Sequence, residues 1–290
     1  MKIVFLGTPI SAVASLQALR DDGHQIVGVV TPPPRRRGRG SALSPTPVHA
    51  AADESGLTVW HDLNVVAESG ADLGVVVAYG AIIKQGVLDA VPMVNVHFSL
   101  LPRWRGAAPV ERAILAGDQL TGVCVMGLEA SLDTGPIYAR TTTPVGEKTS
   151  EELLEELAQL GASLLGDTLR HWDAANPEPQ SGEATYAHKL TVADFALSLT
   201  DDAASLTRRV RLGRAFCMLG ESRLRVRSAR YWSGGRGAAG SIERTPDGIV
   251  LTSDAGSIEL VSVQSEGARA LPAAEWFRGR SPRGEALVWH

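Results

Sequence analysis

The chain begins with MKIVFLGTPISAVASLQALRDDGHQIVGVV, residues 1–30, and this stretch indicates the class of fold. An apolar run over 2–6 stops at a Gly-Thr-Pro turn, helical spacing follows over 12–20, and a second apolar run covers 25–30. Continuous apolar runs are typical of parallel strands, because both faces of such a sheet are covered. Strand, helix and strand in this order predict an open, doubly wound, mostly parallel α/β sheet.

Further strands of this sheet are expected where the same apolar character returns, at 73–79, 94–98 and 121–129. A helix is expected over 109–117. A longer one is expected over 151–172, because its 3.6-residue period follows Ser150, a good N-cap, and two early glutamates. Neither GxGxxG nor GxxxxGK[ST] occurs, so the sequence supports neither dinucleotide nor P-loop phosphate binding.

The last third of the chain has a different residue pattern. A turn-rich segment covers 176–185, a short helix is expected over 203–214, and from about 222 short β-type segments alternate with Gly, Ser and Asp turns. This pattern predicts a small barrel or sandwich. We therefore predict an N-terminal catalytic domain over 1–186, a linker over 187–206 and a C-terminal β-rich domain over 207–290.

Charge is divided unevenly between these regions. The 290 residues carry a net charge of −4, yet 203–290 hold 14 arginines, no lysine and 8 acidic residues, for a charge of +6. Residues 1–202 carry −10. An acidic front and a basic rear suggest two modules, the rear one near an anionic partner. A solvated arginine-rich surface would give the same balance.

Several protein classes are not expected from the composition. No apolar run approaches the ~18–20 residues of a membrane span, and the N-terminus lacks a secretory signal. We expect no membrane association and a cytoplasmic location. Cys124 and Cys217 are interpreted as two buried thiols, and no Cys/His spacing suits a metal, so no metal site is predicted.

The candidate site lies in NVHFSLLPRWRGAAP, residues 95–109. Asn95 and His97 are two apart on a predicted strand, so both side chains point to one face. The following loop combines a Pro, a Gly and two arginines, which is typical of a ligand site. An amide beside an imidazole can stabilise an oxyanion, and the imidazole can also transfer a proton.

A carboxylate partner for His97 is expected at Asp133, in SLDTG, just past the next predicted strand. Neighbouring strand ends converge in a doubly wound sheet, so Asp133 is expected to reach His97 and fix its charge and tautomer. A histidine after an apolar strand is more often a structural residue, and an asparagine there can equally bind backbone.

The sequence NVHFSLLPRWRGAAPVERAILAGD, followed some two dozen residues later by SLDTG, resembles the 10-formyltetrahydrofolate-dependent formyltransferase family. The resemblance includes MKIVFLGTP at the start, VVTPPPRRRGRGSALSPTPV at 29–48, VVVAYGAII at 75–83 and TYAHKL at 185–190. It covers most of the first 200 residues. The RWRGAAP segment is similar to the tRNA-modifying branch of the family.

The resemblance implies an enzyme in which a free amine attacks the formyl carbon of 10-formyltetrahydrofolate. Asn95 and His97 would stabilise the tetrahedral oxyanion, and Asp133 would orient His97 and assist proton movement. No metal is required. The folate donor would be lined by residues of two loops, namely Ile82, Ile83, Ser99, Leu100, Leu101 and Pro102.

The implied acceptor is the amino group of methionyl initiator tRNA, used by a monomeric enzyme of translation initiation. The resemblance assigns tRNA contacts to arginines of two loops, namely Arg35, Arg36, Arg37, Arg39, Arg103 and Arg105. The basic tail would be a small OB-like barrel that grips tRNA through phosphate contacts. From the residues alone, the Arg-rich loop at 32–40 could equally be a solubilising segment.

The chain departs from the family pattern at several positions. Ile10-Ser11 replaces an acidic-Phe pair, Phe98 and Ser131 replace glycines, Lys84 replaces a proline, and VRLGRAFCMLG at 210–220 lacks the expected aromatic-Pro turn. None of these changes touches the three catalytic candidates. Two alternatives remain: a formyltransferase acting on an amino-sugar nucleotide, and a non-catalytic nucleic-acid-binding protein. RWRGAAP and the Arg-rich loop argue against the amino-sugar alternative. The presence of Asn95, His97 and Asp133 together argues against a non-catalytic protein.

Overall fold

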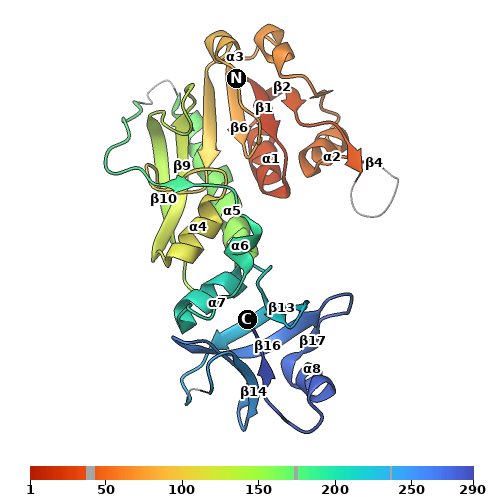
Figure 1. The fold of residues 1–290 in the computed structure, drawn as a ribbon. Helices are drawn as coiled ribbons and strands as arrows, with labels where there is room; N and C mark the ends of the chain where they lie inside the picture. Colours follow the sequence, from red (N-terminus) through yellow and green to blue (C-terminus); the bar gives the residue numbers. More distant parts are fainter. Residues whose placement is uncertain (37–42, 173–175, 236) are drawn as a thin grey trace. The chain divides into compact units, whose positions relative to one another are not determined.

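The computed structural model describes residues 1–36, 43–172, 176–235 and 237–290, which group into two compact units. The first unit comprises 1–110, 120–144 and 153–188, and the second comprises 111–119, 145–152 and 189–290. Each unit has its own seven-stranded sheet. Figure 1 labels several strands of each sheet. The predicted linker contains helix α6, Val192–Phe195, and the start of α7, Ala203–Arg211. The domain limits drawn from the sequence stay a prediction.

The sheet of the first unit has the strand order β10-β9-β7-β6-β1-β2-β5. Its strands are β1 (Lys2–Gly7), β2 (Gln25–Val30), β5 (Val59–Trp60), β6 (Leu73–Val77), β7 (Met93–His97), β9 (Leu120–Gly127) and β10 (Ile137–Pro144). The five strands from β5 to β7 run parallel, whereas β9 and β10 pair antiparallel. The mostly parallel α/β sheet is thus confirmed, with an antiparallel edge that the apolar runs did not distinguish.

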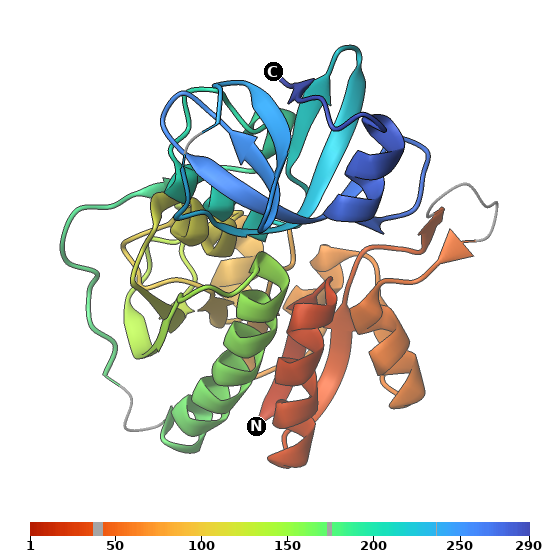
Figure 2. The same cartoon turned by 90° about the horizontal axis from the view of Figure 1, so that it is seen from below.

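Helices cover both faces of this sheet. They are η1 (Ile10–Ala12), α1 (Val13–Asp21), α2 (Pro47–Glu54), η2 (Leu63–Glu68), α3 (Gln85–Ala90) and α5 (Ser150–Arg170). On one face, Val4 and Val76 pack in a buried cluster with Val66 of η2 and Val87 of α3. On the other face, α1 and α5 lie side by side (Figure 2), and their ends are joined by an ion pair between Arg170 and Asp22.

Two short two-stranded sheets complete the first unit. One pairs β3, Arg35–Arg36, with β4, Leu43–Ser44. The other pairs β8, Arg105–Gly106, with β11, Tyr186–Ala187, in parallel. The second of these sheets ties the loop after β7 to the turn-rich segment that the sequence showed at 176–185.

The second unit is an antiparallel β domain in the order β12-β13-β16-β15-β14-β18, with β17 beside β16. The strands are β12 (Phe216–Leu219), β13 (Ser222–Tyr231), β14 (Ser241–Thr245), β15 (Gly248–Thr252), β16 (Ser257–Ser265), β17 (Leu271–Pro272) and β18 (Leu287–Val288). Just beyond β18, His290 exchanges two backbone hydrogen bonds with Met218 of β12, at 2.9 and 3.0 Å. These bonds join the two edges of the sheet, so the domain closes as a small barrel.

One core fills this barrel. Leu224, Val226 and Ile258 of the strands pack there against Leu206 of α7 and Phe277 of α8, Ala273–Arg280. Helix α4, Pro109–Ala116, ends within the residues assigned to this unit.

The divergent 210–220 segment forms the end of α7, a turn and strand β12. Its central Cys217 is buried, and that burial raises the pKa of the thiol to about 12. The segment therefore contributes an ordinary barrel strand in place of the aromatic-Pro turn of the family pattern. No helix among the described residues is long and apolar enough to cross a membrane.

Candidate active site

Asn95 and His97 lie on β7 and face the same side of the sheet, as their spacing predicts. On the antiparallel neighbour β9, Asn95 is opposite Met126 and His97 is opposite Cys124. Directly paired residues project to one face, and Met126 and Cys124 share one buried cluster. His97 is only 6% exposed, while the Asn95 side chain is half-buried.

The His97 imidazole lies between two acceptors. Its Nε2 is 2.9 Å from the backbone oxygen of Trp104, and its Nδ1 is 3.8 Å from Oδ2 of Asp133. A carbonyl oxygen can only accept, so Nε2 carries the hydrogen in this contact. Nδ1 then faces the Asp133 carboxylate. The tautomer therefore follows from the Trp104 carbonyl, which no sequence pattern singles out, rather than from Asp133.

Asp133 reaches His97 by a different route from the one expected. Because β9 runs antiparallel to β7, the end of β9 at Gly127 pairs with Val94, near the start of β7. The loop over 128–136 must fold back across the sheet to bring the buried Asp133 carboxylate to His97. The backbone N–H of Gly106 donates to Oδ2 of that carboxylate at 2.8 Å. One oxygen thus links the loops that follow β7 and β9.

The loop after β7 is held by hydrogen bonds within it and to Thr185. The Ser99 hydroxyl donates to the Arg103 backbone oxygen at 2.6 Å, and the Trp104 N–H donates to the Thr185 hydroxyl at 2.9 Å. Trp104 lies in the left-handed region, with φ at 64°, where its carbonyl meets His97. Gly106 has φ at 117°, and a Cβ there would lie 2.9 Å from the Ala187 oxygen. Only glycine fits this close approach of two backbones.

The residues predicted to bind the folate donor fall into two groups. Ile82 is 90% exposed in the loop after β6, while Ile83 packs against the core. The Thr8 hydroxyl donates to the Tyr79 backbone oxygen at 3.0 Å, which joins the loops that follow β1 and β6.

The second group begins two residues after His97 in the chain. Its side chains range from buried to half-buried, namely Ser99, Leu100, Leu101 and Pro102. The Ser99 hydroxyl is already engaged and Leu101 packs in a buried cluster. These two residues therefore offer their backbone rather than their side chains to a ligand.

The arginines predicted to bind tRNA are placed differently from one another. Arg35 and Arg36 are exposed on β3, whereas Arg37 and Arg39 lie outside the described residues. The Arg103 guanidinium lies over the Trp104 ring, 4.5 Å from its centroid.

Arg105 is half-buried and already engaged within the protein. Its Nη2 and Nε donate to Oε1 of Gln180 at 2.6 and 3.1 Å. Gln180, in the turn-rich segment, is a residue that the sequence analysis passed over.

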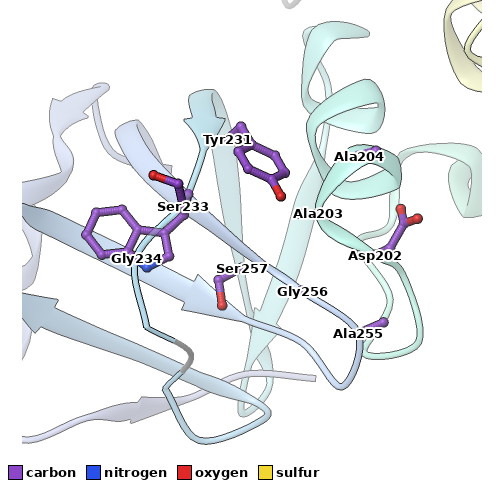
Figure 3. Close-up of a pocket in the computed structure, with 10 residues that line it drawn as sticks. Asp202, Ala203, Ala204, Tyr231, Ser233, Gly234, Ala255, Gly256 and Ser257 are labelled. Carbon is purple, nitrogen blue, oxygen red and sulfur yellow. The ribbon is translucent and has the colours of Figure 1, made fainter.

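A separate hollow of about 360 Å³ lies in the second unit. Figure 3 shows it between the start of α7, Tyr231 at the end of β13, and the turn that carries Gly256. The Asp202 carboxylate at its rim accepts from the Ser205 N–H at 2.7 Å and thereby caps α7. None of the predicted site residues lines this hollow.

The chemistry available beside β7 is that of an amide, an imidazole and a carboxylate. Cys124 lies opposite His97, but burial raises the pKa of its thiol, which disfavours the nucleophilic thiolate. Within the described ranges, no three His, Cys, Asp or Glu side chains are grouped closely enough for a metal ion. The arrangement suits stabilisation of an oxyanion and transfer of a proton.

Two family models match the chain. Formyl transferase matches residues 1–169, and Formyl transferase, C-terminal domain, matches residues 189–281. The chain belongs to the formyl transferase family. The resemblance seen in the sequence is thereby confirmed.

Curated relatives extend this match over nearly the whole length. A methionyl-tRNA formyltransferase of Paracoccus denitrificans is 41% identical over 295 residues, covering 96% of this chain and 97% of the relative. Another of the same name, from Novosphingobium aromaticivorans, is 43% identical over 306 residues, covering 99% and 100%. Among solved structures, HypX from Aquifex aeolicus in complex with tetrahydrofolic acid has the same fold. It superposes with a TM-score of 0.68 at 15% identity, over 96% of this chain and 47% of HypX.

Proposed function

We propose that this chain transfers the formyl group of 10-formyltetrahydrofolate to the free amino group of methionyl initiator tRNA. The observation that carries this proposal is about 40% identity to methionyl-tRNA formyltransferases, over nearly the full length of both chains. The enzyme would act in the cytoplasm as a monomer, with every catalytic group supplied by one chain.

Asn95, His97 and Asp133 would act on the transferred group. The amine attacks the formyl carbon, a C–N bond forms, and the carbonyl oxygen becomes an oxyanion. The half-buried Asn95 amide would donate to that oxyanion, as in other preorganised sites. Collapse of the intermediate breaks the bond between the formyl carbon and the folate nitrogen.

Proton transfer would pass through His97. Its Nε2 hydrogen is committed to the Trp104 carbonyl, so Nδ1 is the atom that takes the proton from the attacking amine. The Asp133 carboxylate, 3.8 Å from Nδ1, stabilises the resulting imidazolium. The proton then goes to the departing folate nitrogen, which leaves the protein unchanged after each cycle.

The donor would bind along the loops that follow β6 and β7. The exposed Ile82 offers apolar surface to the folate rings, and backbone groups between Ser99 and Pro102 offer polar contacts. A neighbour of the same fold was solved with tetrahydrofolic acid, which supports a folate donor for this fold.

Transfer RNA would be held by exposed arginines rather than by the buried site. On β13 of the barrel, Arg223, Arg225 and Arg227 alternate with the core residues Leu224 and Val226. Among the described residues, no carboxylate lies within 4 Å of any of these three guanidinium groups. Alternate residues of a strand are about 6.6–6.8 Å apart, so Arg223 and Arg225 follow one another at this spacing on the outer face of β13. Arg227 continues this row at the irregularity of pairing between Val226 and Ser228. Such a row suits successive phosphates.

The decisive experiment compares acceptors. Purified protein is given 10-formyltetrahydrofolate with a labelled formyl group, and methionyl initiator tRNA or an amino-sugar nucleotide as acceptor. Formylation of the tRNA alone is expected. Formylation of the sugar alone would overturn the acceptor, and transfer to neither would overturn the proposed function.

A further inference from the structure

The Gln180 carboxamide joins three segments of the candidate site. Its Nε2 donates to the backbone oxygens of Asp133 and Gly135, both at 2.8 Å. Its Oε1 accepts the two hydrogen bonds from Arg105. Both ends of one side chain are therefore occupied, and the half-buried amide has no unused hydrogen.

The segment that carries Gln180 runs along both loops. Before Gln180, the backbone of Glu178 exchanges hydrogen bonds with Ile137, at 2.8 and 2.9 Å, on the far side of the Asp133 loop. After it, β11 pairs with β8, which contains Gly106. Residues 176–187, which we call the strap, thus contact the loop after β7 and the loop after β9.

The Asp133 loop needs such support. It bears the carboxylate that faces His97, yet it leaves β9 at the opposite end of β7. Asp133 itself has φ at 51°, in the left-handed region that is uncommon for residues other than glycine. Within the described residues, the backbone oxygens at Asp133 and Gly135 are both bonded to Gln180.

We propose that Gln180 is a positioning residue that fixes the Asp133 carboxylate between His97 and Gly106, with Arg105 orienting its amide. The inference rests on the proposed function for its kinetic consequence, but not for its geometry. Arg105, which the sequence analysis assigned to tRNA binding, would instead support the catalytic carboxylate.

The main test is Gln180→Glu. This change keeps an oxygen for Arg105 but replaces the NH2 group by a carboxylate oxygen that faces two carbonyl oxygens. We expect kcat to fall ~10–100-fold, with the KM values for donor and tRNA little changed, because misplacement costs rate rather than binding. The matched control is Gln119→Glu, the same change at an exposed glutamine of the second unit, which should behave as wild type. A kcat equal to wild type for Gln180→Glu would overturn the proposal.

A second readout does not depend on activity. The Gly106 N–H donates to the Asp133 carboxylate, so its hydrogen-exchange rate in protein labelled with 15N-glycine reports the position of that carboxylate. We expect faster exchange at Gly106 in Gln180→Glu, with the melting temperature and the glycines outside the strap and the Asp133 loop unchanged. Unchanged exchange at Gly106 would overturn the positioning role, even if wild-type protein formylated no tRNA.

A double-mutant cycle tests the part assigned to Arg105. If Arg105 acts through Gln180, then Arg105→Ala combined with Gln180→Ala should be no slower than the slower single variant. Additive losses, with a rise in the KM for tRNA caused by Arg105→Ala alone, would instead show a direct tRNA contact. That result would remove Arg105 from the network.

Discussion

The catalytic candidates and the outer face of β13 use polar side chains in opposite ways. Beside β7, His97 lies between an oxygen of Trp104 and the Asp133 carboxylate, and that carboxylate also accepts from the Gly106 N–H. On β13, Arg225 and Arg227 extend into solvent, with no carboxylate within 4 Å among the described residues. The first region holds a small number of atoms in a fixed arrangement. The second region presents positive charge on side chains that extend into solvent.

The difference follows from what each region would bind. A tetrahedral intermediate lasts briefly and its charge is placed to within a fraction of an ångström, so its partners must be fixed in advance. A nucleic-acid backbone presents regularly repeated negative charge. Solvated arginines can bind it without a fixed geometry, because phosphate contacts carry no sequence information. Changes at the first region should therefore affect kcat, and changes at the second should affect KM and its salt dependence.

The largest expected effect is that of His97→Ala. Loss of a group that stabilises the transition state costs ~2.7–4 kcal/mol, so kcat should fall ~10²–10³-fold. The KM for tRNA should change little, because β13 is untouched. Steady-state kinetics with methionyl initiator tRNA measures both constants, and circular dichroism checks the fold. Near-normal turnover would remove His97 from the site.

Asp133→Asn should follow, with a loss in kcat of ~10²-fold, because His97 still transfers the proton but loses the charge that stabilises its protonated form. The asparagine still offers an oxygen to the Gly106 N–H, so the loop should keep its place. What disappears is the negative charge that faces Nδ1 of His97. The pH profile of kcat/KM should therefore change shape, and a profile that overlays the wild type would contradict the role of this charge.

Sequence reasoning found the residues of the first region more easily than the connections between them. Asn95 and His97 share a face because a strand has a period of two, and that relation is local. The partnership of His97 and Asp133 was expected from converging strand ends, but β9 runs the other way and the loop folds back. Strand direction at a sheet edge depends on long-range pairing, which an apolar run does not reveal.

The support for the site is harder still to predict. The Trp104 carbonyl that sets the tautomer of His97 is a backbone atom, and any residue type would supply it. Gln180 lies in a segment with turn composition. The pairing of β11 with β8 brings this segment beside Arg105, where the Gln180 side chain makes its hydrogen bonds. In the second region the sequence indicated short β-type segments and an excess of arginines. Which arginines face outward is seen only in the structure, where Arg225 and Arg227 lie on either side of the buried Val226.

Removal of charge from β13 tests the second region. Arg225→Gln with Arg227→Gln should raise the KM for tRNA several-fold and leave kcat unchanged. If both arginines meet phosphates, the slope of log KM against log salt should decrease by ~1.4–1.8. Arg244→Gln with Arg283→Gln removes the same charge from exposed positions outside β13 and serves as the control. Equal effects from both pairs would mean that net charge, and not the β13 row, matters.

A smaller effect is expected from the Arg-rich loop near β3. Replacing Arg35, Arg36, Arg37 and Arg39 by alanine should weaken the use of tRNA and flatten its salt dependence, with no change in the KM for the folate donor. The measurement is formyl transfer at several salt concentrations. An unchanged salt slope would return this loop to the role of a solubilising segment.

The smallest effect is expected for Asp202, whose charge stabilises the barrel domain itself. Asp202→Ala removes the N-cap of α7 and should lower the free energy of unfolding by ~1 kcal/mol, with activity unchanged. Hydrogen bonds from Ser205 lower the pKa of the Asp202 carboxyl, so its contribution is present above the unfolded-state pKa and is lost as pH falls through the folded-state pKa. Urea denaturation of the full chain should show the lower free energy of unfolding at neutral pH and a smaller difference from wild type in acid. Asp202→Asn, which keeps a capping oxygen, should lose less, and a deficit independent of pH would contradict the ionised cap.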